Sequence, residues 1–188
     1  MKMILYLAIT AIIACVSSQM MKVLLNYVGN KKIPSVSTVF QDGAFPSSHS
    51  AYTTSITVAT WLNVITNIES DMCEIYIWLA VVTTVFSSVV IRDALGVRRT
   101  VQKLCDTVIL MLEDENHKQD EFKKLKEKLK VKNGHEPHEV IGGIVWGILV
   151  ALLTSCVYYH YLKYLPIVIF LMAVFIIYGI LRAKSNHA

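Results

Sequence analysis

The chain has 188 residues, of which 54% are hydrophobic and 17% are charged, with a formal net charge of +4. This composition excludes an ordinary soluble domain, and we expect no nucleic-acid partner. The apolar residues occur in long blocks, and a bilayer core about 30 Å thick needs roughly 20 apolar residues in each spanning helix. Because lipid offers the backbone no hydrogen-bond partners, the blocks are expected to be transmembrane helices.

Five blocks follow one another along the chain. The second is the least apolar because it carries six Ser and Thr hydroxyls, a composition typical of a buried helix that packs against other helices. The sequence therefore predicts an all-α fold: a multi-pass membrane bundle of about five transmembrane helices that forms a single domain over residues 1–188. The blocks lie at residues 3–25, 50–65, 75–91, 140–161 and 165–181.

The first block also has the features of a secretion signal. Lys2 precedes an apolar run, and residues 12–15 resemble a lipoprotein cleavage box ending at Cys15. The apolar pattern continues past Cys15 to Leu25, which is longer than the core of a signal peptide. A first transmembrane helix is therefore the favoured interpretation.

The cysteines indicate neither a metal site nor a disulfide framework. There are four, none lies in a C-x-x-C pair, and three fall in or beside apolar blocks. That distribution favours buried, small apolar side chains. We expect no metal and no cofactor. The cysteines are Cys15, Cys73, Cys105 and Cys156.

The charged connections predict the orientation in the membrane. The connection at residues 66–74 has three acidic residues and no Lys or Arg, whereas the connections at 27–45 and 92–139 are rich in Lys or Arg. By the positive-inside rule, the N-terminus and residues 66–74 lie outside and the two basic connections and the C-terminus lie inside. We expect a protein of the cell (inner) membrane whose functional site faces the cytoplasm.

Residues 110–133 are expected to form a charged cytoplasmic helical insertion. Phe122, Leu125 and Leu129 have a helical spacing among lysines and glutamates, and the Asn133-Gly134 pair is suited to ending a helix. A solvated charged helix is favoured over a surface that rests on anionic lipid headgroups.

The first polar cluster precedes the second block, at residues 42–50. Ser47 and Ser48 are suited to capping that helix, and a helix N-terminus binds anions through its free N–H groups and dipole. His49, in the same turn, would add a proton donor. The alternative is a plain Ser-rich cap.

The second cluster, at residues 92–99, follows the third block. Guanidinium groups match phosphate oxygens in two-pronged geometry, so Arg98 and Arg99 are candidates for binding phosphate. Asp93 would hold an arginine in place, and Gly96 would let a ligand or another helix approach closely. The alternative is that the arginines anchor the helix among the lipid headgroups.

The third cluster lies just before the fourth block. His135 and Glu139 are four residues apart, which on a helix places them on one face. A carboxylate that binds one imidazole nitrogen leaves the other available as a nucleophile. His138 points elsewhere and is not expected to take part.

The predicted topology brings the three clusters and Lys22 to the cytoplasmic ends of their helices. Two histidines, several cations and a helix N-terminus in one place are what a phosphoryl-transfer site requires. Because all of these motifs are predicted to lie on one side of the membrane, a phosphate site is better supported by the whole set than by any single cluster.

At these residues the chain resembles the divergent branch of the type 2 phosphatidic acid phosphatase family, which is similar to vanadium-dependent haloperoxidases. The resemblance runs from about Gln19 to Gly147, and four motifs occur in the family's order. Gln102 and Leu104 stand where that branch usually has Gly and Gln. The motifs are Gln19-x-x-Lys22, Pro46-Ser47-Ser48-His49-Ser50-Ala51, Asp93-Ala94-x-Gly96-Val97-Arg98-Arg99 and Gly134-His135-x-Pro137-x-Glu139-Val140.

The resemblance implies a phosphate-binding set. By this similarity Lys22 binds phosphate, Ser47 and Ser48 cradle it, and Arg98 or Arg99 clamps it. The family needs no metal for phosphatase action, so the cations of the chain would supply the positive charge.

The resemblance also implies the catalytic set. His135 would be the nucleophile that forms a phosphohistidine, His49 the general acid, and Glu139 would stand where the family has Asp. Residues 164–188, an additional helix and tail, lie beyond the resemblance.

The sequence thus predicts a metal-independent lipid phosphatase. The expected substrate is a phosphomonoester or pyrophosphate, such as phosphatidic acid, phosphatidylglycerol phosphate or a polyprenyl phosphate. Membrane lipids are the other expected partners, and a homo-oligomer is compatible with the sequence. The alternative is a catalytically inactive membrane protein that binds anionic lipid or assembles partners.

Overall fold

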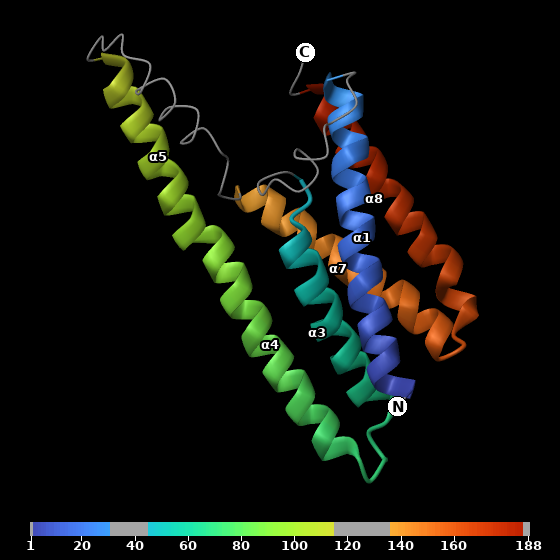
Figure 1. Cartoon of the computed structure of the whole chain (residues 1–188). Helices are drawn as coiled ribbons and strands as arrows, with labels where there is room; N and C mark the ends of the chain where they lie inside the picture. The colour runs from blue at the N-terminus through green and yellow to red at the C-terminus, as the bar shows by residue number, and fades with distance from the viewer. Residues whose placement is uncertain (1, 31–44, 115–135, 186–188) are drawn as a thin grey trace.

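The computed structural model describes residues 2–30, 45–114 and 136–185. These residues form helices and no strand, which confirms the all-α class (Figure 1). Only the first five residues of the expected insertion at 110–133 are described, as the end of a helix, and the rest lies outside the described residues. The helices are α1 (Lys2–Asn30), α3 (Ser48–Thr66), α4 (Cys73–Leu95), α5 (Val97–Asp114), α7 (Pro137–Tyr158) and α8 (Leu165–Ser185), with a 3-10 turn at Leu162–Tyr164.

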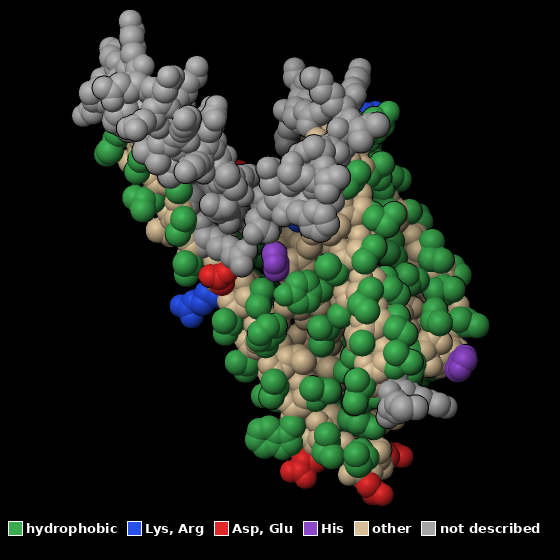
Figure 2. Space-filling view, in the orientation of Figure 1, with side chains coloured by type: hydrophobic (Ala, Val, Ile, Leu, Met, Phe, Trp, Pro, Cys, Tyr) green, Lys and Arg blue, Asp and Glu red, His purple; other side chains and the backbone are tan. Residues whose placement is uncertain are grey.

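Four of the described helices are long and apolar enough to cross a membrane: α1, α4, α7 and α8. The outer faces of α4 and α8 carry apolar side chains at the surface, as expected where a helix faces lipid (Figure 2). Exposed examples are Ile75, Trp78, Val82, Val85, Phe86, Val89, Ile167, Phe170, Ile177 and Leu181.

Helix α3 is the polar helix at the centre of the bundle. It packs against α1, α4 and α7, and its hydroxyls are largely buried, as the sequence predicts for the second block (Figure 1). Most of these hydroxyls bond to carbonyls one turn back, which satisfies them without water. The buried polar residues of α3 are Ser48, Ser50, Thr53, Thr54, Ser55, Thr60 and Asn63.

Hydrogen bonds between hydroxyls fix α3 against α4. Thr57 Oγ1 donates to the Thr83 carbonyl at 3.1 Å, and the Thr60 and Thr83 hydroxyls are 3.0 Å apart. The indole of Trp61 donates to Thr84 Oγ1 at 3.0 Å. The two helices are antiparallel, so this register brings the end of α4 level with the start of α3.

Helices α1 and α7 are joined in the same way. The hydroxyls of Tyr6 and Ser155 are 2.6 Å apart, and the Trp146 indole donates to Ser17 Oγ at 2.9 Å. These helices are also antiparallel, and their register places Lys22 level with the first turn of α7.

Two glycines of α7 allow α3 to approach closely. A Cβ on Gly143 would lie 2.3 Å from the Ser47 carbonyl oxygen, and a Cβ on Gly147 would lie 2.3 Å from the Ala51 carbonyl oxygen. The spacing of four residues puts both glycines on one face, the arrangement by which small residues let membrane helices pack backbone to backbone. This contact aligns the starts of α3 and α7.

The two ends of the bundle differ in charge. The connection between α3 and α4 carries Glu69 and Asp71, and it lies at the end opposite to the starts of α3 and α7 (Figures 1 and 2). The end of α8, with Arg182 and Lys184, lies at the same end as those starts. The arrangement agrees with the sequence prediction that the polar motifs share one end.

The close α3–α7 contact predicts the effect of filling it. Replacing Gly147 with Val puts side-chain atoms where the Ala51 carbonyl lies, so the helices must separate. We expect a loss of stability of at least about 1–3 kcal/mol, the usual cost of overpacking, seen as a lower unfolding midpoint in detergent. Val145→Leu, on a more exposed part of the same helix, is the control and should change the midpoint little. An unchanged midpoint for Gly147→Val would contradict the described packing.

Candidate functional site

The start of α3 has the geometry that the sequence predicts for a capped helix. Ser47 is the N-cap residue, and its Oγ accepts the backbone N–H of Ser50 at 3.4 Å. The preceding peptide bond, between Phe45 and Pro46, is cis. Ser48 is 3% exposed, and its Oγ is buried without a hydrogen-bond partner among the described residues. A buried hydroxyl in the first turn is therefore available to a ligand.

The start of α7 adjoins the start of α3. The backbone N–H of Ser47 donates to the carbonyl oxygen of Glu139 at 2.8 Å, which ties the two first turns together. Glu136 is the N-cap of α7 and Pro137 its first residue, where the missing N–H costs nothing. The Glu139 side chain is 4% exposed, and its Oε2 accepts the N–H of Glu136 at 3.0 Å in a capping box.

The expected partnership of His135 with Glu139 is not part of the described structure. His135 lies outside the described residues, and α7 begins after it, at Pro137. The expectation that the two residues share a helical face therefore stays a prediction. His138 is described: its Nδ1 lies 3.1 Å from a Glu136 carboxylate oxygen, and its ring lies beside the ring of Phe45.

Lys22 is the buried cation that α1 contributes near the starts of α3 and α7. It is 7% exposed, and the α1–α7 register brings it level with Glu139. Gln19, one turn earlier on α1, has a buried Oε1 without a hydrogen-bond partner among the described residues. Lys22 and the Gln19 Oε1 atom of the first motif are therefore buried at the level where α3 and α7 begin, whereas Met20 between them is exposed.

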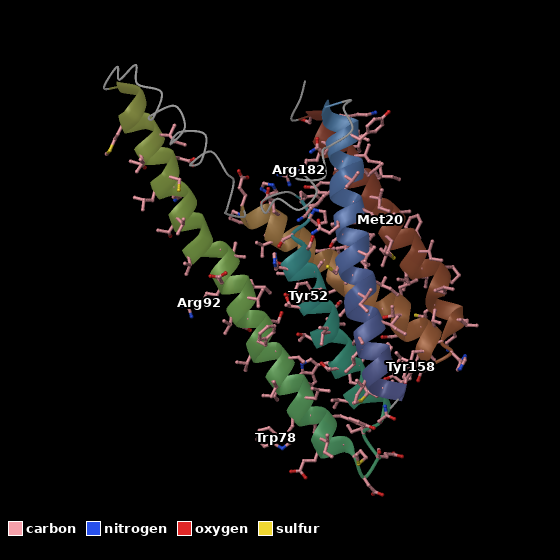
Figure 3. The ribbon with its side chains drawn as sticks, in the orientation of Figure 1. Met20, Tyr52, Trp78, Arg92, Tyr158 and Arg182 are labelled. Atoms are coloured by element: carbon pink, nitrogen blue, oxygen red, sulfur yellow. The ribbon has the colours of Figure 1, made fainter. Side chains whose placement is uncertain are left out.

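The arginine cluster is divided between two helices. Helix α4 ends at Leu95, and the N–H of Gly96 bonds to the Arg92 carbonyl at 2.8 Å before α5 starts at Val97. Arg92 is exposed on the outside of α4 (Figure 3). Arg92 therefore belongs to α4, whereas Arg98 and Arg99 belong to α5.

Helix α5 carries Arg98 and Arg99 in its first turn, and the described structure does not include the positions of their side chains. Their backbone follows the end of α4, which the α3–α4 register brings level with Ser47. Asp93, in the last turn of α4, is partly buried. These residues therefore lie at the same end of the bundle as Ser47, but among the described helices α5 contacts α4 alone.

Phe45 is a site residue that the sequence analysis missed. Its ring packs against Phe175 and Tyr178 of α8, with ring centres 5.7 and 6.5 Å away. The guanidinium carbon of Arg182 lies 5.5 Å from the centre of the ring, beside the start of α3 (Figure 3). A Cβ on Gly142 would lie 2.1 Å from this ring, so that glycine makes the room. The only sequence signal was an aromatic residue next to the Pro-Ser-Ser-His motif.

The assembled candidate site is a helix N-terminus with a buried cation and a buried hydroxyl. The helix dipole at the start of α3 favours an anion, and low local dielectric strengthens the attraction. Among the described residues no group of three or more His, Cys, Asp or Glu side chains is arranged to hold a metal ion. The described members are Lys22, Ser47, Ser48, His49 and Glu139.

Comparison with known proteins supports this interpretation. A family model described as the divergent PAP2 family matches residues 5–150, which include every residue of the candidate site. The uncharacterized membrane protein YuiD of Bacillus subtilis (strain 168) is 29% identical over 155 residues, which cover 78% of this chain and 92% of that protein. No solved structure matches the chain.

Replacing Ser47 and replacing Ser48 should have different effects on stability and on anion binding. Ser47→Ala removes the cap and should lower stability by about 1 kcal/mol. Ser48→Ala removes a buried hydroxyl that has no partner among the described residues, so it should leave the unfolding midpoint in detergent unchanged or raise it. It should, however, weaken binding of orthovanadate, which mimics phosphate. The same loss of stability in both variants, with equal vanadate affinity, would contradict these roles.

Proposed function

Because the chain belongs to the divergent PAP2 family, we propose that it is a membrane-embedded phosphatase that releases phosphate from a lipid phosphomonoester or pyrophosphate. The observation that carries the proposal is the buried start of α3, where Ser48 and Lys22 lie level with the first turn of α7. That combination suits an anion such as phosphate.

Binding of the phosphate uses positive charge that is already in place. The N–H groups of the first α3 turn and the Ser48 hydroxyl donate to phosphate oxygens, and Lys22 offsets their charge. Arg98 or Arg99 would complete the set with a two-pronged contact. These groups neutralise the equatorial oxygens in the transition state, which is where catalysis of phosphoryl transfer gains most.

The chemistry then proceeds in two steps. The free imidazole nitrogen of His135 attacks phosphorus and forms a P–N bond, while the P–O bond to the lipid breaks and His49 protonates the departing oxygen. Water next attacks the phosphohistidine, gives up a proton to His49, and releases phosphate and neutral His135. Glu139, which is buried next to the Ser47 amide, would stabilise the positive charge on His135.

A lipid is the favoured substrate because the site lies at the end of a membrane bundle. The helices around it carry apolar surfaces that suit contact with acyl or prenyl chains, while the polar groups sit where the helices begin. Phosphatidic acid, phosphatidylglycerol phosphate and polyprenyl phosphates all present a terminal phosphate at that depth.

Mutation of the proposed catalytic groups tests the proposal. We expect the wild-type protein to release phosphate from at least one member of a panel of lipid phosphates in detergent with EDTA present.

His135→Ala should lower turnover at least about a thousandfold, which is about 4 kcal/mol of barrier. His49→Ala should be less severe for a substrate with a good leaving group. Glu139→Gln should lie between the two, and Arg98→Lys should raise KM because it loses the two-pronged contact.

Glu69→Gln, at the opposite end of the bundle, is the control and should retain full activity. Near-wild-type turnover in His135→Ala would refute phosphohistidine catalysis. Phosphate release by none of the substrates from a folded protein would instead favour the anionic-lipid-binding alternative.

The proposed orientation places the site on the cytoplasmic side of the cell membrane. Asp71 and Lys184 are exposed at opposite ends of the bundle and suit single-cysteine labelling in a chain without its native cysteines. An impermeant maleimide should label Asp71→Cys on intact cells and Lys184→Cys only after permeabilisation, because the basic end stays inside. Labelling of Lys184→Cys alone on intact cells would reverse the proposed orientation.

A further inference from the structure

Arg182 is a cation whose guanidinium N–H groups have no hydrogen-bond partner among the described residues. It lies in the last turn of α8, partly buried, with its guanidinium carbon 5.5 Å from the centre of the Phe45 ring. Among the described residues it makes no ion pair and no hydrogen bond. A guanidinium carries five N–H donors, so its edge remains available to an acceptor.

The ring beneath Arg182 is fixed in place. Phe45 packs against Phe175 and Tyr178, and it fills the space that Gly142 leaves on α7. A guanidinium that stacks on an aromatic face keeps its planar edge directed away from the ring, where it can bind a phosphate in two-pronged geometry. The packing therefore holds the ring that the cation contacts in place before any ligand arrives.

The cation also lies beside the candidate site. Phe45 is separated from Ser47, the N-cap of α3, by Pro46 alone, and Ser47 is bonded to the first turn of α7. Arg182 comes from α8, beyond residues 5–150 that the family model matches. The chain thus adds a positively charged group, from outside the family region, next to the start of α3.

We propose that Arg182 forms a second anion subsite, which binds a second phosphate group located next to the scissile phosphate on the same lipid. Substrates that carry two neighbouring phosphates, as a pyrophosphate or as a phosphodiester beside a phosphomonoester, are then favoured over a lipid with a lone phosphomonoester. This inference rests on the proposed phosphatase function for the identity of the substrate, but not for the binding of the anion.

Lys184 provides a matched control for charge. It lies in the same last turn of α8 and is exposed, and no ring contact ties it to Phe45. Arg182→Gln and Lys184→Gln therefore remove one positive charge each from the same end of the same helix. Only the first removes the cation that is stacked beside the start of α3.

The kinetic test compares two substrates in a neutral detergent: a prenyl diphosphate and the corresponding prenyl monophosphate. Arg182→Gln should lower kcat/KM for the diphosphate about tenfold, mainly through KM, and change the monophosphate less than about twofold. Arg182→Lys should restore part of the loss, and Lys184→Gln should match wild type. Equal losses for both substrates, or no loss for either, would overturn the proposal.

The source of the second phosphate is tested by adding an anionic phospholipid to the detergent. If the subsite takes a phosphate of the substrate, the effect of Arg182→Gln on the diphosphate persists with added phospholipid. If it takes the headgroup of a neighbouring lipid, Arg182→Gln slows the monophosphate reaction only when the phospholipid is present, and the proposal is wrong.

A binding test separates this proposal from the proposed function. Inorganic pyrophosphate should raise the unfolding midpoint of wild type and Lys184→Gln more than inorganic phosphate at equal concentration. In Arg182→Gln the two anions should have equal effects. This result without any turnover would retain the subsite and refute the phosphatase function. An undiminished advantage of pyrophosphate in Arg182→Gln would refute the subsite.

Discussion

The close approach of α3 to α7 is the contact on which the rest of the molecule depends. Gly143 and Gly147 bring the backbones so near that a methyl group would meet a carbonyl oxygen, and the Ser47 N–H then reaches the Glu139 carbonyl. Without this contact the starts of the two helices would not coincide. A polar helix such as α3 is unfavourable against lipid, so its enclosure by α1, α4 and α7 removes it from contact with lipid.

The same constraint explains how function follows from the fold. Hydrogen bonds along the bundle fix the antiparallel registers, and those registers determine what lies level with the start of α3. Lys22 reaches that level on α1, and the end of α4 reaches it on the other side. An anion site of this kind is assembled from residues far apart in the chain by helix packing, so it needs no flexible loop to bring its described members together.

Much of this arrangement was predictable from the sequence. Block length and hydropathy gave the spanning helices, and the hydroxyls of residues 50–65 predicted a buried helix, since both signals depend on local composition. Helix α5 was missed because the sequence analysis assigned residues 92–139 to a charged connection between transmembrane helices. The contact of Phe45 with Arg182 was missed because nothing local links a residue before α3 to the end of α8. Residues 164–188 were interpreted as an additional helix and tail beyond the family resemblance. Phe175 of that helix nevertheless packs on the Phe45 ring.

The most direct test of the central claim is a structure determined with bound tungstate, a heavy-atom mimic of phosphate located by its anomalous signal. The account predicts one strong site at the start of α3, with the ion accepting hydrogen bonds from Ser48 Oγ and the first-turn amides and lying next to the Lys22 ammonium. A tungstate ion bound elsewhere, with the start of α3 empty at saturating concentration, would contradict the claim that this end of the bundle is built to hold phosphate.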